Sequence, residues 1–182
     1  DLGILARTIV TEGGGNPLLI GELLRYVITE GIDPALLGSR PTLPVNKISL
    51  ERLSVLPADA RRLLEVIAIS DHPIRARTAA IAAGTSSRAG LRALESAKFV
   101  RRCADDGAMF EAQHNRIREA VVDELSAETL RIHHRSIANA LERQGGADPE
   151  ALARHWIGAG EYSRALIHVR RAAERAMHAL AF

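Results

Sequence analysis

The sequence predicts a mainly α protein with one small β-hairpin. Three observations support this class. Apolar residues recur at helical spacing along most of the chain, and hydrophobic residues make up 47% of it while aromatic residues make up only 3%. One Asp-Gly pair also stands between two short extended runs. An aliphatic, aromatic-poor composition suits packed helices better than a β-sandwich, and Asp-Gly is a strong hairpin signal.

Length, charge and cysteine content restrict the class of protein. The 182 residues are enough for one large domain or two small ones with a real core. The formal net charge of +2 does not by itself call for a nucleic-acid partner. A single cysteine, Cys103, excludes an intrachain disulfide and fits a reducing compartment, so we expect a cytoplasmic protein. No apolar run has membrane-spanning length, and no signal-peptide pattern opens the chain.

Residues 1–35 are predicted to form two helices around a glycine-rich turn. Leu2–Thr11 has helical spacing, and glycines 13–15 end this helix because glycine costs backbone entropy. Asn16 and Pro17 then start the second helix, as its cap and first residue. Because the chain starts at a residue other than methionine and ends within a helical pattern, we expect it to be a piece of a larger protein.

Residues 36–48 hold two prolines and one glycine and are predicted as a linker. Residues 49–126 follow as one domain that begins with three helices. One opens after Pro57, the next is Ala76–Ala83, and a serine at position 86 or 87 caps the third. The first of these helices has an apolar face made of Ala60, Leu63, Leu64 and Ile67.

A β-hairpin and a fourth helix complete this domain. The hairpin joins residues 99–103 to residues 108–113 through Asp105-Asp106-Gly107. His114 stands where the second strand passes into an amphipathic helix. Three helices, a hairpin and a further helix are the order expected of a winged helix.

Residues 127–182 are predicted to be a helical extension. The helix Ala127–Gln144 ends at a Gly-Gly pair, and Asp148-Pro149 begins the next helix. Gly158 and Gly160 form an elbow before the last helix. Leu152, Trp156 and Ile157 form an apolar stripe before the elbow, and Tyr162, Ala165, Leu166 and Val169 follow it.

Two motifs resemble those of one protein family. The run FEAQHNRIREAV, residues 110–121, resembles the F-x-H-x-x-I-R-E-A-V run of the signal-transduction nucleotide-switch (STAND-class) ATPases. The run GNPLLIGELL, residues 15–24, resembles the Gly-x-Pro motif of the same class. The two motifs stand in the family's order, about a hundred residues apart. Bacterial members include transcription regulators of the LuxR and maltose-activator type, and Ser/Thr kinases and cyclases that carry the ATPase module.

The resemblance implies a role for three residues. His114 would donate a hydrogen bond to the β-phosphate of bound ADP and so report the nucleotide state. Pro17 would lie against the adenine, with the backbone near Leu18 beside it. Asn115 stands where the better-known branch of the family has an aspartate, so any role of that aspartate is in question here.

The last part of the chain has its own resemblance. The run HHRSIANALE, residues 133–142, resembles the family's L-H-x-x-I-A-x-x-L-E run, and residues 155–176 resemble the entry into a tetratricopeptide-like (TPR-like) helical array. Only about one repeat is present. A single repeat cannot bury both its faces, so we expect it to lean on the winged helix or to expose an apolar surface.

The sequence lacks the chemistry of a complete ATPase. A P-loop needs a glycine-rich turn that ends in Lys-Ser or Lys-Thr, and neither Lys47 nor Lys98 is so placed. We therefore expect no catalytic residue and no ATP hydrolysis by this segment alone, and histidine spacing predicts no metal site. The resemblance implies that ATP or ADP is bound in the complete protein through an upstream P-loop domain. It also implies downstream helical repeats, and a protein ligand or homo-oligomer as partner.

Two alternatives remain open at this level. Arg88, Arg92, Arg101 and Arg102 lie on or near the third helix, so the domain could instead be a DNA-binding regulator with a helical dimerisation tail. Glu95 and two aspartates interrupt that basic patch, and the third helix has no aromatic, Asn or Gln base reader, so interdomain contact is the preferred role of these arginines. His114, in turn, could simply cap the next helix or bond a backbone carbonyl.

Overall fold

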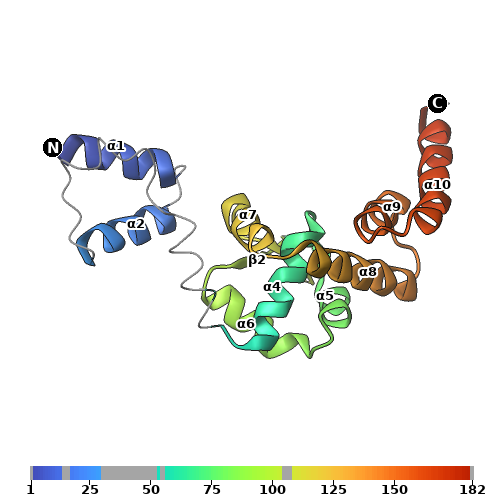
Figure 1. Ribbon diagram of the computed structural model, residues 1–182, viewed down its shortest axis with the longest axis horizontal. Helices are drawn as coiled ribbons and strands as arrows, with labels where there is room; N and C mark the ends of the chain where they lie inside the picture. Colours follow the sequence, from blue (N-terminus) through green and yellow to red (C-terminus); the bar gives the residue numbers. More distant parts are fainter. Residues whose placement is uncertain (1, 14–16, 30–52, 54–55, 104–107, 181–182) are drawn as a thin grey trace. The chain divides into compact units, whose positions relative to one another are not determined.

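The chain divides into two units, Asp1–Val55 and Leu56–Phe182, in a computed structural model that describes residues 2–13, 17–29, 53, 56–103 and 108–180 (Figure 1). These residues contain nine helices and one three-stranded antiparallel sheet. The predicted class, mainly α with a small β-hairpin, is therefore confirmed. Each unit is described by itself.

The first unit contains α1 (Leu2–Gly13) and α2 (Pro17–Thr29), which pack on each other. Leu5, Ile9, Leu23 and Val27 are buried. Helix α1 extends two residues beyond the predicted Leu2–Thr11 and ends at Gly13, the first of the three glycines. The start of α2 at Pro17 agrees with the prediction. Residues 14–16 and the linker at 36–48 lie outside the described residues.

Helix α4 (Ala58–Ser70) is the central element of the second unit and contacts α5 (Ala76–Ala83) and α6 (Ser87–Ser96). The bounds of α5 agree with the prediction, and Gly84 ends it with a φ of 63°, a left-handed conformation that glycine adopts without strain. The apolar face expected on α4 is buried, and it consists of Ala60, Leu63, Leu64 and Ile67.

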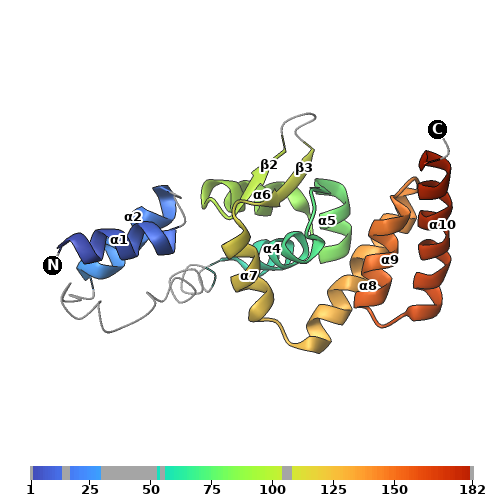
Figure 2. The same ribbon diagram turned by 90° about the horizontal axis from the view of Figure 1, so that it is seen from above.

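The sheet has the order β1-β3-β2 and is antiparallel throughout. Strands β2 (Val100–Arg102) and β3 (Met109–Ala112) form the predicted hairpin, with β2 beside α6 (Figure 2). The turn at 104–107 lies outside the described residues. Strand β1 (Ile74–Arg75), which pairs Ile74 with Phe110, was not predicted, because two residues carry no readable periodicity.

Two helices follow the sheet and return to α4. Helix α7 (Asn115–Asp123) packs on α4, and α8 (Ala127–Gln144) packs on both α4 and α5. The bounds of α8 agree with the prediction. Ser126 caps it by accepting a hydrogen bond from the backbone N–H of Thr129 at 3.1 Å.

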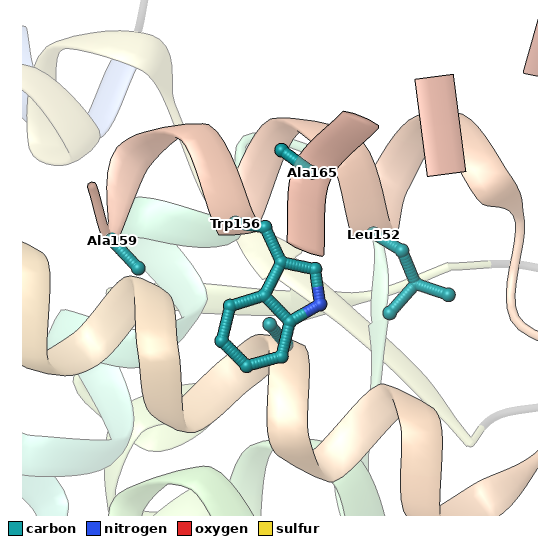
Figure 3. Packing of buried hydrophobic residues seen from close by; sticks show 5 residues of the cluster. Leu152, Trp156, Ala159 and Ala165 are labelled. Carbon is teal, nitrogen blue, oxygen red and sulfur yellow. The ribbon is translucent and has the colours of Figure 1, made fainter. Parts of the chain in front are cut away.

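Helix α9 (Pro149–Gly158) packs on α8 and on α10 (Tyr162–Leu180). The indole of Trp156 reaches from α9 toward α8 and is fully buried (Figure 3). Ala138, Leu152, Ala159 and Ala165 surround it.

The apolar stripes of these helices are buried only in part. Tyr162 and Leu166 are 70% and 68% exposed, and Ile157 and Val169 are also exposed. Only the small Ala165 of α10 enters the cluster. An exposed apolar surface, one of the two outcomes expected for a single repeat, is found here, because no further helix among the described residues covers this side of α10.

Candidate functional site

His114 stands between β3 and α7, in an extended backbone conformation (φ −147°, ψ 148°). Backbone hydrogen bonds fix the chain on both sides of His114, at the junction that we call the hinge. The N–H of Gln113 donates to the carbonyl of Phe99 at 2.9 Å, and the carbonyl of His114 accepts from the N–H of Ile117 at 3.0 Å. The position of the imidazole is therefore set by the end of the sheet and the first turn of the helix.

The imidazole borders an open hollow of about 390 Å³. Besides His114, its titratable and charged lining residues come from four places in the fold: Asp71 and His72 after α4, Arg101 on β2, Glu111 on β3, and Arg118 on α7. Two ion pairs form among the residues that line the hollow. Arg118 lies 3.2 Å from Asp71, and Arg101 lies 2.7 Å from Glu111. These arginines are partly exposed, so an incoming anion can share them with the carboxylates.

The His114 imidazole is half-buried and makes no hydrogen bond to any described residue. His114 is the N-cap residue of α7, but its side chain makes no capping hydrogen bond. Burial lowers the pKa of His114, and the nearby charge of Arg101 lowers it further. The ring is therefore neutral at neutral pH, with one N–H to donate and one nitrogen to accept.

Asn115, the residue that departs from the family pattern, is engaged in the first turn of α7. Its Nδ2 donates to Glu119 at 2.6 Å, and its Oδ1 accepts from the Nε of Arg118 at 2.9 Å. An asparagine here can both donate and accept, which an aspartate could not do. The side chain thereby holds Arg118, which also borders the hollow.

The other predicted nucleotide residues belong to the first unit. Pro17 is exposed at the start of α2, and Leu18 follows it in that helix, although the Leu18 side chain lies outside the described residues. Pro17 and Leu18 are therefore described in one unit and His114 in the other. Their predicted joint contact with a nucleotide stays a prediction.

The four arginines proposed for DNA or interdomain contact fall into two pairs. Arg101 forms an ion pair with Glu111, and Arg102 forms one with Glu95. Arg88 and Arg92 are exposed on α6 and make no ion pair with a described residue. Both of these border a second, larger hollow, of about 1060 Å³, together with Arg77 of α5. Sequence reasoning missed Arg77, because nothing in the local pattern shows that the start of α5 faces α6.

Three histidines that the sequence did not single out are buried: His133, His155 and His168. The Nδ1 atoms of His134 and His155 lie 3.0 Å apart, so one ring donates to the other. Burial lowers the pKa of His155 to about 3, and the neighbouring His134, Arg154 and His72 lower it in the same direction. These rings join α8 to α9 and have a structural role.

The described residues contain no group of three or more His, Cys, Asp or Glu side chains placed to hold a metal ion. None of the helices in the described part of the chain combines the length and apolarity that crossing a membrane requires. Comparisons with protein-family models, with curated proteins and with solved structures found no match to this chain.

Proposed function

We propose that this chain is a regulatory segment of a signal-transduction nucleotide-switch ATPase, in which residues 49–126 are a winged-helix domain and His114 senses the bound nucleotide. The observation that carries the proposal is the setting of His114. Its imidazole has no partner among the described residues, borders an open hollow, and stands at a strand-to-helix hinge. A ring held in the core by packing would instead be enclosed and hydrogen-bonded.

The surroundings of His114 favour an anionic ligand. Arg101 and Arg118 border the same hollow and can donate to phosphate oxygens. A phosphate beside His114 would favour the protonated ring and offset the lowering of its pKa by burial and Arg101. A charge-assisted hydrogen bond of this kind is worth about 1.5–3 kcal/mol. That is enough to shift an equilibrium between two arrangements of the winged helix substantially.

The packing offers a route from the hinge to the helical extension. Helix α7 begins beside His114 and packs on α4, and α8 packs on α4 as well. Helix α8 in turn contacts α9. In the proposed mechanism, loss of the phosphate contact releases α7, and the change in packing on α4 reaches α8 and the repeat-like helices. These helices would then bind a signal molecule or a partner protein.

The test is ADP retention by a protein that carries this chain together with its P-loop domain. His114→Ala should speed ADP release roughly 10- to 150-fold, which corresponds to the strength of the lost bond. Retention should also strengthen as the pH falls toward the ordinary histidine pKa of about 6.5, because binding takes up a proton. The matched control is His178→Ala, an exposed histidine of α10. Equal release rates for His114→Ala and the unsubstituted protein would contradict the sensor role.

The alternative function is a winged-helix DNA-binding regulator with a helical dimerisation tail. One observation favours it: Arg88 and Arg92 of α6 are exposed and unpaired among the described residues. Against it, Arg102 is held by two hydrogen bonds to Glu95, and α6 has no Asn, Gln or aromatic residue to read base edges. A salt-dependent shift of duplex DNA, lost on Arg88→Ala with Arg92→Ala, would support this function. No shift at low salt would remove it.

A further inference from the structure

The larger hollow lies in the second unit, between α5, α6 and the sheet, and it is independent of the His114 hinge. We call it the arginine groove and define it by Arg77 on α5, Arg88 and Arg92 on α6, Arg102 on β2, and the apolar residues Ile81 and Phe110. Its volume is about 1060 Å³. No acidic side chain is found among the described residues that line it.

Three of the four arginines are available to a ligand. Arg77, Arg88 and Arg92 are exposed and form no ion pair with a described residue. Arg102 differs, because its guanidinium makes two hydrogen bonds to Glu95, at 2.6 and 2.9 Å, and lies 5.3 Å from the centre of the Phe110 ring. Arg102 is thus a fixed wall of the groove, while the other three can turn toward a ligand.

Apolar groups line the groove between these arginines. Ile81 is 39% exposed, although it is a large aliphatic residue, and Ala80 beside it is half-buried. Leu91 and Phe110 extend the apolar lining and are themselves well packed. An exposed aliphatic side chain inside a basic rim offers an apolar contact as well as charge-assisted hydrogen bonds.

We propose that the arginine groove binds an acidic peptide segment that carries an apolar anchor residue. The anchor would lie on Ile81 and Ala80, and carboxylates on either side would pair with Arg77, Arg88 and Arg92. Arginine is suited to this contact because its planar fork matches a carboxylate through two parallel hydrogen bonds. This binding site does not depend on nucleotide sensing at His114.

A peptide fits this groove better than nucleic acid does. Helix α6 has the sequence SRAGLRALES, which includes no Asn, Gln or aromatic residue to read base edges. The apolar lining gives a phosphate backbone nothing to bind, whereas it can bury an aliphatic anchor. The absence of acidic groups among the described lining residues suits carboxylates and phosphates alike, so the apolar lining is the feature that favours a peptide.

The test uses the 182-residue chain and fluorescent peptides in which one or two leucines are flanked by glutamates. Fluorescence anisotropy should show saturable binding. Arg88→Gln with Arg92→Gln should weaken it by at least about tenfold, and so should Ile81→Ser. Both changes are at exposed positions, so the fold should remain, which circular dichroism checks. The matched control for charge is Arg131→Gln with Arg171→Gln, two exposed arginines outside the groove, and it should change binding less than about twofold.

Four outcomes would overturn the proposal. The first is that no peptide of the set binds saturably. The second is equal weakening by the control pair, which would mean that only overall charge matters. The third is equal binding of a peptide with serines in place of the leucines. The fourth is that a short duplex DNA binds more tightly than the peptides and is insensitive to Ile81→Ser, which would make the groove a nucleic-acid site.

Discussion

The two halves of the second unit are held together by different chemistry. The α4–α7 region, residues 58–123, buries large aliphatic side chains, including Leu63, Leu64, Ile67 and Leu94. The α8–α10 region, residues 127–180, buries mainly alanines, one tryptophan and three histidines. Aliphatic burial stabilises at almost any pH, whereas the buried His155 ring, whose pKa burial lowers to about 3, must stay neutral. We therefore expect the second region to be the more sensitive to pH and to small changes in shape.

Glu142 shows how far polar contacts organise the α8–α10 region. Its carboxylate on α8 accepts hydrogen bonds from Trp156 Nε1 at 3.0 Å, Arg164 at 2.8 Å and His168 Nε2 at 3.2 Å. The guanidinium of Arg164 also lies 3.5 Å from the centre of the Trp156 ring. One acidic residue thus joins α8, α9 and α10. No described carboxylate of the α4–α7 region joins three helices in this way.

A polar contact also ties the two regions to each other. His133 of α8 lies 3.1 Å from the carboxylate of Glu65 on α4. Burial acts to raise the pKa of Glu65, but the hydrogen bonds and charges of His133 and Arg61 outweigh it, and the pKa is lowered. Protonation of Glu65 at low pH should therefore weaken the contact between α4 and α8 and lower the free energy of unfolding.

The largest effect is expected from removing the tryptophan. Trp156→Ala should lower the free energy of unfolding by about 3–5 kcal/mol, because it leaves a cavity at the centre of the α8–α10 cluster. Hydrogen exchange should show lost protection in α9 and α10 while α4 to α6 keep theirs. Trp156→Phe is the control that keeps most of the volume but loses the donor to Glu142. Equal loss of protection in both regions would contradict the claim that different contacts stabilise the α4–α7 and α8–α10 regions.

Acid should destabilise the protein through the buried histidine pair. The pKa of His155 is about 3 in the folded chain and about 6.5 when unfolded, so between these values the unfolded state holds one more proton. The free energy of unfolding should therefore fall as the pH falls, by up to about 1.4 kcal/mol per pH unit from this residue. The pKa of His134 is also lowered, mainly by burial, and acts in the same direction.

The measurement is urea unfolding at several pH values between about 7 and about 4. His155→Gln, which can still bond His134, should show a shallower loss of stability with falling pH than the unsubstituted chain. His178→Gln, at an exposed position, is the control and should keep the full slope. An unchanged slope in His155→Gln would show that another group carries the acid sensitivity.

The smallest of these effects should come from one added methyl group. A Cβ at Gly158 would lie 2.6 Å from atoms of the His134 ring, which the bond to His155 restrains. Gly158→Ala should therefore cost about 1–3 kcal/mol in thermal or urea unfolding. The cost should shrink when His134→Ala removes the ring, which a double-mutant cycle measures. Gly21→Ala is the control, since a Cβ there meets nothing within 4 Å. An equal cost with and without the His134 ring would contradict the steric explanation.

Helix ends in the second unit could be predicted because their signals are local. Gly84 ends α5, Gly145 follows α8, and Pro149 opens α9. Each of these residues acts through its own backbone angles. The same holds for the hinge at His114, since the change from alternating to helical spacing is visible in the sequence.

Burial of polar residues could not be predicted in this way. Trp156 and Ile157 are neighbours in an apolar stretch, yet one is fully buried and the other exposed. His155 and His168 are polar, yet both are buried, because α8, α9 and α10 meet around them. A sequence pattern shows which residues share a helix face, and it does not show how many helices cover that face.

By itself the sequence determined the helical class, most helix ends of the second unit, and the position of His114 at the end of a strand, because these depend on neighbours a few residues away. Tertiary structure alone decided the pairing of β1 with β3, the His134–His155 contact, and the meeting of Arg77 with Arg88 and Arg92 in one groove. These contacts join residues that are distant in the chain, and they form because β1 pairs with β3, α8 packs on α9, and α5 packs on α6.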